Sequence, residues 1–380
     1  MKLSLVQLAG AEGRPTLVVG PSLGTSVTAL WSRAAAHLGE RFHVVGWELP
    51  GHGSGTPVQD PFTIADLAAG VVEAVDRTLG AVTFGYAGDS VGGAVGLQLA
   101  LDAPDRLTGA AVLCTGARIG SDRSWHERAA RVRSMGTPAV VEMSAKRWFA
   151  PGFLEREPDA GTALLRSLQD TDRESYALVC EALAAFDIRG RLSAIGVPVL
   201  ALGGSHDAAT PAAVLREETA AVPGGRFVEL DGVAHLAPAE APRTVADLLT
   251  DFFVCVPARD PVHEAGMKVR RAVLGDAHVD RAIERTGDVT RDFQEFITRY
   301  AWGSVWTRPG LARRDRSIAV LTALVAGRHF EELEFHLRAA LTNGLSREEI
   351  VEVLLQSAVY VGVPAANTAF GVAARVLAEG

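Results

Sequence analysis

The stretch GDSVGG, residues 88–93, decides how the first two thirds of this chain are interpreted. It sets Ser90 between glycines that lie two positions away on either side. A strand-like run precedes it at 81–85 and an apolar helical run follows at 94–100, so the segment predicts a strand, a sharp turn and a helix. Glycines relieve the crowding around a strained serine at such a turn, which is the setting of a catalytic nucleophile. Ordinary turns also use glycine and serine, so the motif alone is a weak signal.

An aspartate and a histidine follow two later strand-like runs. Asp207 comes after the run 198–202, and His235 comes after the run 226–230. Taken singly, Asp207 could cap the next helix and His235 could be an ordinary loop histidine. Loops that follow parallel strands meet at one edge of a sheet, so these two residues and Ser90 are expected to converge there. The order serine, acid, histidine then predicts a nucleophilic triad.

Short apolar runs recur through the first 255 residues and alternate with helical patterns. They are continuous in polarity, as in parallel strands buried on both faces, and lie at 15–20, 42–46, 81–85, 109–114, 198–202 and 226–230. Helical stretches between most of them predict a doubly wound, mostly parallel sheet. Residues from about 118 to 191 interrupt this rhythm with a helical, arginine-rich pattern, which predicts a helical cap over the sheet.

The pattern changes after residue 255. Residues 256–261, VPARDP, predict a linker, and no strand-like run follows them. Residues 317–341 and 346–378 are instead long, amphipathic and alanine-rich. The sequence therefore predicts an α/β domain over 1–255 and an all-α domain over 262–380.

Composition and charge exclude several classes of partner and site. The formal net charge of −8 argues against nucleic acid and anionic membranes, because both attract a basic surface. The three cysteines are scattered, without a C-x-x-C pair or a cysteine–histidine cluster, so we expect neither a structural zinc nor a disulfide framework. No run fits a signal peptide or a membrane span, and a cytoplasmic location is expected. We expect no metal and no cofactor.

The first 255 residues resemble the α/β-hydrolase family. Residues 47–55, WELPGHGSG, are similar to that family's turn after its second conserved strand, where His52 is expected to be structural. The loop SLGT at 22–25 resembles the corresponding loop of β-ketoadipate enol-lactone hydrolases. On this resemblance, the backbone N–H groups of Leu23 and Val91 are the oxyanion donors.

The same resemblance implies a mechanism for ring opening. Ser90 attacks a lactone carbonyl, His235 takes the serine proton, and Asp207 orients the imidazole. The cap must then hold the free carboxylate of the substrate, which suits the forked guanidinium of an arginine. Six cap arginines remain open for that role: Arg118, Arg123, Arg128, Arg131, Arg133 and Arg147. Trp148, in the same region, is a further candidate for substrate binding.

A second constellation lies in the helical region. Glu332 and His336 are four residues apart, which places them on one helix face within reach of each other. A carboxylate beside a histidine is expected to raise its pKa and to orient it for proton transfer. An isolated pair of this kind is more often a solvated, salt-bridged face.

The surrounding segments 300–310, 336–344 and 360–367 resemble 4-carboxymuconolactone decarboxylases, and the resemblance covers most of 262–380. It implies that His336 donates a proton and that Glu332 is its partner. Weaker candidates for binding carboxylates are Arg308, Arg313 and Arg338. Trp302 and Trp306 could line a pocket, although core packing explains both more simply. Related proteins of this fold use a C-x-x-C thiol pair, which a domain without cysteine excludes.

The two halves resemble consecutive enzymes in the protocatechuate branch of the β-ketoadipate pathway. The sequence therefore predicts a bifunctional enzyme that acts on small dicarboxylate and tricarboxylate lactones. It would convert 4-carboxymuconolactone to 3-oxoadipate enol-lactone and then to 3-oxoadipate. Two alternatives remain open: a general carboxylesterase or lactonase whose helical domain serves oligomerisation only, and a non-catalytic scaffold.

The helical region also carries more apolar residues than one small core can bury. The surplus is formed by Leu321, Leu324, Val325, Val351, Leu354, Leu355 and Val359. A surplus apolar face marks a subunit interface, so we expect a homo-oligomer held together by the C-terminal domain.

Overall fold

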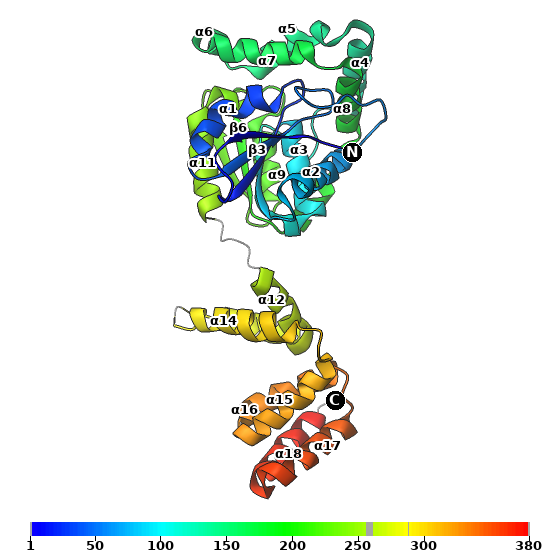
Figure 1. The fold of residues 1–380 in the computed structure, drawn as a ribbon, viewed down its shortest axis with the longest axis vertical. Helices are drawn as coiled ribbons and strands as arrows, with labels where there is room; N and C mark the ends of the chain where they lie inside the picture. Colours follow the sequence, from blue (N-terminus) through cyan, green and yellow to red (C-terminus); the bar gives the residue numbers. More distant parts are fainter. Residues whose placement is uncertain (1, 256–260, 288, 379–380) are drawn as a thin grey trace. The chain divides into compact units, whose positions relative to one another are not determined.

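The structure, a computed structural model, describes residues 2–255, 261–287 and 289–378. The chain falls into two units, Met1–Ala258 and Arg259–Gly380, and each unit is considered by itself (Figure 1). The predicted linker at 256–261 lies outside the described residues, apart from residue 261. Among the helices that the structure describes, none combines the length and the apolar character needed to cross a bilayer.

A seven-stranded sheet forms the centre of the N-terminal unit, in the order β1-β3-β2-β4-β5-β6-β7. The strands are β1 (Leu5–Ala9), β2 (Thr16–Gly20), β3 (His43–Trp47), β4 (Phe84–Asp89), β5 (Leu107–Leu113), β6 (Val199–Gly204) and β7 (Arg226–Leu230). Strand β1 pairs antiparallel with β3, whereas all the other pairs are parallel. The predicted doubly wound, mostly parallel sheet is confirmed.

Two strands differ from the sequence-based expectation. The half-buried edge strand β1 is not among the predicted runs. Strand β4 begins at Phe84, three residues after the predicted start at 81, and it continues through glycine-containing sequence to Asp89. Glycine normally weakens a strand, but a Cβ at Gly88 would meet the carbonyl oxygen of Gly92 at 2.2 Å. The close approach of the following turn therefore requires glycine inside this strand.

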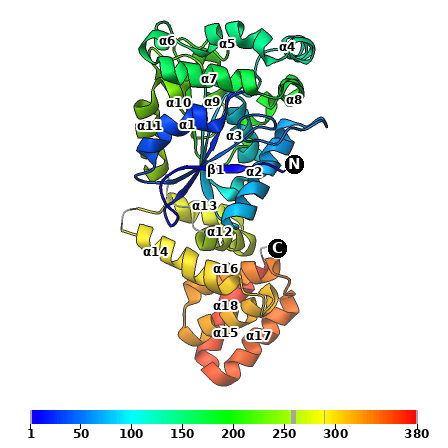
Figure 2. The ribbon, with the colours of Figure 1, turned by 45° about the horizontal axis from the view of Figure 1, so that its top comes forward.

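Helices cover both faces of the sheet. Helices α1 (Val27–Leu38) and α11 (Pro242–Cys255) lie on one face, and α2 (Ile64–Leu79) and α3 (Val91–Asp102) lie on the other (Figure 2). Residues 91–100 of α3 are all buried, so this helix is held rigidly where it starts. The remaining short helices outside the cap are η1 (Pro104–Arg106), η3 (Arg189–Ala194), α9 (Ala212–Ala220) and α10 (Ala237–Glu240).

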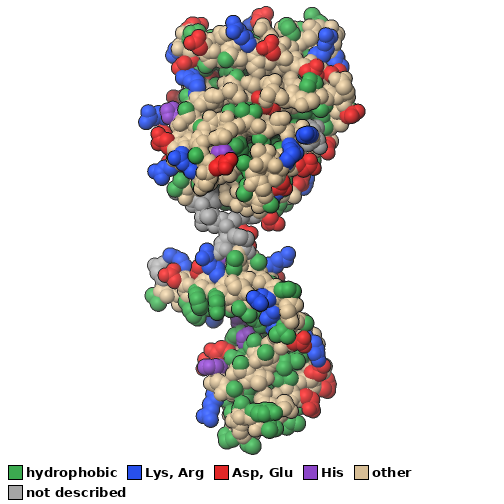
Figure 3. Space-filling view, in the orientation of Figure 1, with side chains coloured by type: hydrophobic (Ala, Val, Ile, Leu, Met, Phe, Trp, Pro, Cys, Tyr) green, Lys and Arg blue, Asp and Glu red, His purple; other side chains and the backbone are tan. Residues whose placement is uncertain are grey.

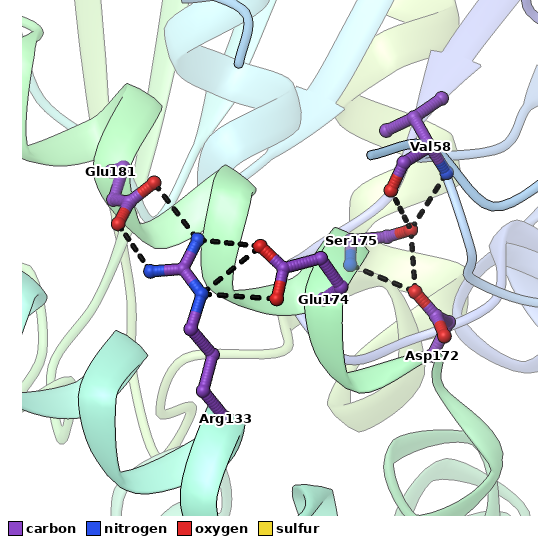
Figure 4. A network of polar contacts seen from close by, with 6 residues as sticks. All are labelled: Val58, Arg133, Asp172, Glu174, Ser175 and Glu181. Atoms are coloured by element: carbon purple, nitrogen blue, oxygen red, sulfur yellow. Dashed lines mark hydrogen bonds and ion pairs between the residues drawn. The ribbon is translucent and has the colours of Figure 1, made fainter. Parts of the chain in front are cut away.

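Most of the region between β5 and β6, residues 122–185, forms the predicted helical cap (Figure 1). Its elements are α4 (Asp122–Met135), η2 (Thr137–Val140), α5 (Val141–Trp148), α6 (Phe153–Arg156), α7 (Pro158–Asp170) and α8 (Arg173–Ala185). Arg133 of α4 donates to Glu174 of α8 at 2.7 Å and to Glu181 of α8 at 3.1 Å (Figure 4). The start of α8 is tied to the body of the unit, because the Ser175 hydroxyl accepts the N–H of Val58 at 3.0 Å. Arg133 thus binds two cap helices together.

The C-terminal unit is helical throughout its described residues, as predicted. Its elements are α12 (Pro261–Leu274), α13 (Asp276–Glu284), α14 (Arg291–Ile297), the π-helix η4 (Thr298–Trp306), α15 (Arg313–Gly327), α16 (Phe330–Thr342), α17 (Arg347–Val361) and α18 (Val363–Ala378). Leucine, isoleucine, valine and alanine side chains from α15 to α18 pack into one core. A smaller cluster joins Val273 of α12, Trp302 of η4 and Ala339 of α16.

Both long helical stretches expected from the sequence are broken in two. The first ends at Gly327, and Arg328 follows in the left-handed conformation with a φ of 59°. The second breaks at Gly362, with a φ of 87°, and Pro364 follows in the first turn of α18. Glycine reaches this φ without strain and proline is tolerated in a first helical turn, so Gly362 and Pro364 together encode the second break.

Candidate active sites

Ser90, His235 and Asp207 meet at the carboxyl edge of the sheet. Ser90 follows β4, Asp207 follows β6 and His235 follows β7. The Nε2 atom of His235 lies 2.9 Å from Oγ of Ser90, and its Nδ1 atom lies 2.8 Å from Oδ2 of Asp207. All three side chains are buried. The structure therefore brings the three residues of the predicted triad into one hydrogen-bonded chain.

The backbone at Ser90 is strained, with a φ of 54° in a residue other than glycine. Neighbouring groups hold it there: its N–H donates to the carbonyl of Leu113 at 2.8 Å, and its own carbonyl accepts the hydroxyl of Thr115 at 2.6 Å. A Cβ at Gly92 would lie 2.7 Å from the backbone of Gly20, so this residue must be glycine for the turn to pack against β2. The turn presents Ser90 to His235 in a conformation that a relaxed chain would not keep.

Asp207 contacts His235, as the triad predicts, but it does not cap the next helix, because α9 begins at Ala212 and its N-cap residue Pro211 has no side-chain hydrogen bond. The Oδ1 atom of Asp207 instead accepts the N–H groups of Ala209 and Thr210 in the loop before α9. Its Oδ2 atom accepts the Thr210 hydroxyl at 2.6 Å in addition to His235. Burial raises the pKa of Asp207, but the adjacent His235 and the hydrogen bonds from Thr210 outweigh burial and leave the pKa below its ordinary value. Asp207 is therefore ionised at neutral pH and able to stabilise an imidazolium.

A cavity opens over Ser90 between the cap and the sheet edge. It is lined by Ser22, Leu23, Ser90, Ile119, Gly120, Ser124, Trp125, Arg128, Ser144, Arg147, Trp148, Ala209 and His235. The predicted residue Trp148 is buried, and its carbonyl accepts the backbone N–H of His235 at 3.1 Å. This contact joins the cap directly to the loop that carries the histidine.

Two of the six cap arginines line the cavity. Arg128 is held in place, because its Nε donates to the Tyr176 hydroxyl at 2.7 Å and its Nη2 donates to Ser144 at 2.8 Å. Arg147 has no hydrogen-bond or ion-pair partner in the part of the chain that the structure describes. Arg147 is exposed as a whole residue, but partial burial of its guanidinium, followed by the nearby charge of Arg128, lowers its pKa, and the charge of Asp207 opposes this only in part.

The other four cap arginines do not line the cavity. Arg118 pairs with Asp187 at 3.3 Å, Arg123 pairs with Glu127 at 2.8 Å, and Arg133 is held by two glutamates of α8. Arg131 is exposed. Three of the four arginines are thus already paired with carboxylates of the protein.

The residues expected to supply the oxyanion donors lie on either side of Ser90. Val91 is the first residue of α3, where a helix leaves its N–H without an intrahelical acceptor. Leu23 lies in the loop after β2 and lines the cavity. Ser22 was not predicted as a site residue, but its buried hydroxyl lines the same cavity and has no hydrogen-bond partner among the described residues. Its position directly before Leu23 is the signal that could have identified it.

Glu332 and His336 lie on α16 as expected, but the electrostatics differ from the prediction. Burial, followed by the nearby His278, lowers the pKa of His336 to about 4, and the charge of Glu332 opposes this only in part. The expectation of a raised pKa is therefore wrong. The imidazole packs against Phe335 with ring centres 4.5 Å apart. Loss of hydration there destabilises the imidazolium more than the charge of the exposed Glu332 stabilises it.

The candidate arginines of the helical unit lie on its surface. Arg308 and Arg313 are exposed, and Arg338 pairs with Glu334 at 3.0 Å. Arg338 is two residues from His336 along α16, and such positions do not face each other on a helix. Trp302 is buried and packs against Trp306 with ring centres 5.1 Å apart, in accord with the simpler core interpretation.

Arg270, a buried arginine of this unit, is not among the residues predicted from the sequence. Only 5% of its surface is exposed. Its Nη1 donates to the Thr298 hydroxyl at 3.1 Å and its Nη2 donates to Oε1 of Gln294 at 2.9 Å, whereas Nε has no partner among the described residues. Arg270 shares a face of α12 with the buried residues Gly266 and Val273, and this helical spacing could have drawn attention to it.

Within the described residues, no group of three or more histidine, cysteine, aspartate or glutamate side chains is arranged to hold a metal ion.

Comparisons with known proteins match the two units separately. The family model described as "alpha/beta hydrolase fold" matches residues 15–242, and that of the "Carboxymuconolactone decarboxylase family" matches residues 291–375. The 3-oxoadipate enol-lactonase 2 of Acinetobacter baylyi is 34% identical over 204 residues, which cover 54% of this chain and 76% of that protein. The 4-carboxymuconolactone decarboxylase of the same organism is 43% identical over 117 residues, 31% of this chain and 87% of that protein.

A solved structure supports the first of these similarities. The enol-lactonase from Burkholderia xenovorans LB400 superposes with a TM-score of 0.63 at 34% identity, covering 66% of this chain and 96% of that one. Together with the Ser90–His235–Asp207 geometry and the helical second unit, these matches determine the family. The chain belongs to the α/β-hydrolase family through its N-terminal unit and to the carboxymuconolactone decarboxylase family through its C-terminal unit.

Proposed function

We propose that this chain catalyses two consecutive steps, the decarboxylation of 4-carboxymuconolactone and the hydrolysis of the resulting 3-oxoadipate enol-lactone to 3-oxoadipate. The observation that carries this proposal is that relatives named for these two activities match separate units of one chain. The product of the second unit is then the substrate of the first. A general esterase with an accessory helical domain would not require that agreement.

Hydrolysis begins with His235, whose Nε2 atom takes the proton of Ser90 across 2.9 Å. The serine oxygen attacks the lactone carbonyl, and the N–H groups of Leu23 and Val91 stabilise the negative oxygen that forms. The ring C–O bond then breaks. The leaving enolate needs little acid assistance, and it becomes the ketone of the acyl-enzyme after protonation. His235 next activates a water molecule that releases 3-oxoadipate and restores Ser90.

The free carboxylate of the enol-lactone binds Arg147 in this proposal. Arg147 lines the cavity over Ser90 and has no carboxylate partner among the described residues, while Arg128 beside it is already hydrogen-bonded to Tyr176 and Ser144. Arg128 would then act as a fixed second positive charge, and the carboxylate would complete the coordination of Arg147.

Replacing Arg147 with methionine is expected to lower kcat/KM for the enol-lactone by about 10- to 100-fold, since a hydrogen bond to a charged group contributes about 1.5–3 kcal/mol. Hydrolysis of a small uncharged ester should change little, because that substrate makes no such bond. Steady-state kinetics with both substrates checks this. The exposed Arg123, paired with Glu127, provides the control variant Arg123→Met. Equal losses on both substrates would favour the general esterase.

Decarboxylation needs a proton rather than a cofactor. The departing carboxylate is attached to the ring carbon next to the alkene, and the alkene is conjugated with the lactone carbonyl. The electron pair left by the loss of CO2 therefore delocalises into a dienolate, which must be protonated on carbon. His336 is neutral in the free site at pH 7, because its pKa is about 4. Carboxylates of a bound substrate favour the imidazolium and raise that pKa toward the range of a proton donor, with Glu332 adding to the same effect.

Product analysis of the purified chain tests the proposal as a whole. Incubation with 4-carboxymuconolactone should release CO2 and yield 3-oxoadipate, with enol-lactone present only as a transient species. If 3-oxoadipate forms from supplied enol-lactone but no CO2 is released from 4-carboxymuconolactone, only the hydrolase activity is supported. If neither CO2 nor 3-oxoadipate forms, both proposed activities are refuted.

We further propose that the chain associates through α17 and the start of α18. Val351, Leu355 and Val359 recur every four residues on α17 and are 38%, 54% and 76% exposed, and Val363 is also exposed. Figure 3 shows hydrophobic side chains gathered on the surface of this part of the unit. Fewer apolar residues are left exposed than the sequence predicted. Leu321, Val325 and Leu354 are buried in the unit's own core, and Leu324 packs partly against it. A second copy of the chain would cover the exposed apolar residues of α17 and the start of α18.

The double variant Leu355→Asp, Val359→Asp is expected to run as a monomer, because two charges cannot be buried in an apolar interface without a large desolvation cost. Light scattering of the full chain measures the mass, and circular dichroism checks that the helices persist. Met135→Asp, at an exposed apolar site of the cap, is the matched control. An unchanged mass in the double variant would place the interface elsewhere.

A further inference from the structure

Arg270 is a buried cation that lacks a counter-ion in the described part of the chain. Its two hydrogen-bond acceptors, Thr298 and Gln294, are neutral. Its Nε–H is buried without an acceptor. A buried charge without an opposite charge is unfavourable, and such groups are normally paired. This arrangement suits a residue that completes its coordination with an anionic ligand.

A cleft of about 320 Å³ lies against the same residues. It is lined by His278, Arg281, Ala282, Arg285, Thr286, Thr290 and Gln294. Gln294 therefore contacts both the cleft and Arg270. Among the described residues, the lining contains two arginines, a histidine, two threonine hydroxyls and the Gln294 amide but no carboxylate, although the chain as a whole carries a net charge of −8. A lining in which cationic and neutral hydrogen-bonding groups predominate is complementary to a carboxylate-bearing molecule.

A chain of ring contacts connects the cleft to His336, with each pair of rings tilted by 35°. The His278 ring centre lies 4.9 Å from that of Phe335, which lies 4.5 Å from that of His336. The positive charges of Arg281 and Arg270 act on His278, and His278 in turn acts on His336. Arg270, the cleft and the candidate proton donor thus form one continuous group in α12, α13, α14, η4 and α16.

We propose that Arg270, His278 and Arg281 form the carboxylate-binding site of the C-terminal unit and hold a di- or tricarboxylate substrate next to His336. The inference rests on the proposed decarboxylase function and goes beyond it by naming the residues that recognise the substrate. Arg270 is not part of the cleft lining but is hydrogen-bonded to Gln294, which is. In this proposal the buried Nε–H of Arg270 binds one carboxylate, and the exposed Arg281 binds another. The surface arginines Arg308, Arg313 and Arg338 have no part in this site.

Binding of propane-1,2,3-tricarboxylate, measured by calorimetry, tests the site without relying on turnover. The titrations use the full chain in an Arg147→Met background, which removes the unpaired cap arginine as a second anion site. Arg270→Met and Arg281→Met are each expected to weaken binding by about tenfold or more, the effect of losing a charge-assisted hydrogen bond. Arg271→Met should bind as the parent does, because the neighbouring Arg271 is already paired with Asp276 and Asp280.

Thermal unfolding separates a binding role from a structural one. Methionine fills much of the arginine volume without a buried charge, so Arg270→Met should keep or raise the Tm while losing affinity. A lower Tm with unchanged affinity would make Arg270 structural and overturn the inference. Tricarboxylate affinities within about twofold of the parent for both Arg270→Met and Arg281→Met would also overturn the inference, even if the chain releases CO2 normally. Tricarboxylate binding that depends on Arg270 in a chain that releases no CO2 would instead retain the site and refute the decarboxylase.

Discussion

The Ser90→Ala variant is expected to lose hydrolysis of 3-oxoadipate enol-lactone by about 10⁶-fold in kcat, the scale seen when a serine hydrolase loses its nucleophile. The alanine has no oxygen to attack the carbonyl, and the 2.9 Å contact to His235 disappears with it. Release of CO2 from 4-carboxymuconolactone should continue, because His336 and Arg270 belong to the other unit. Enol-lactone should therefore accumulate in a reaction followed by proton NMR.

This result also distinguishes the proposal from its alternatives. A non-catalytic scaffold would show no activity to lose, and a single-function esterase would show no CO2. Ser134→Ala, at an exposed serine whose hydroxyl bonds only to the carbonyl of Arg131, controls for the loss of a hydroxyl elsewhere in the unit. Hydrolysis by Ser90→Ala well above the uncatalysed rate would mean that another group is the nucleophile.

The complementary change, His336→Ala, is expected to lower the rate of CO2 release by about 10²–10⁴-fold, the usual contribution of a general acid or base. The dienolate would then have no positioned proton donor. Hydrolysis of supplied enol-lactone should stay within experimental error of the parent, because the triad lies in the other unit. Initial rates of CO2 release and of 3-oxoadipate formation, measured on the same preparation, check both statements.

Two further variants make this test specific. His329→Ala removes an exposed histidine just before α16 and should leave both rates unchanged. Glu332→Gln should lower CO2 release by less than His336→Ala does, since Glu332 acts on the imidazole through its charge. A decarboxylation rate that is unaffected by His336→Ala would move the proton donor to another group, with His278 the next residue to examine.

The sequence by itself determined the class of both units and pointed to the three residues that meet at the edge of the sheet. Ser90, Asp207 and His235 could be recognised because each follows a strand-like run, and the carboxyl ends of parallel strands meet at one edge. The capping box at the start of α17 is equally local, with the Ser346 hydroxyl accepting the N–H of Glu349 at 3.1 Å. Features encoded by a few neighbouring residues were thus predictable.

Only the tertiary structure decided which charged groups are available. Arg133 and Arg147 have the same chemistry in the sequence, but Arg133 bonds to glutamates 41 and 48 residues away along the chain, whereas Arg147 bonds to no carboxylate among the described residues. The pKa of His336 depends in the same way on burial and on His278, which lies on another helix. The free Nε–H of Arg270 likewise follows from where Thr298 and Gln294 pack. Long-range packing sets the solvent exposure and the counter-ions of each group, and these contacts are absent from any local pattern of residues.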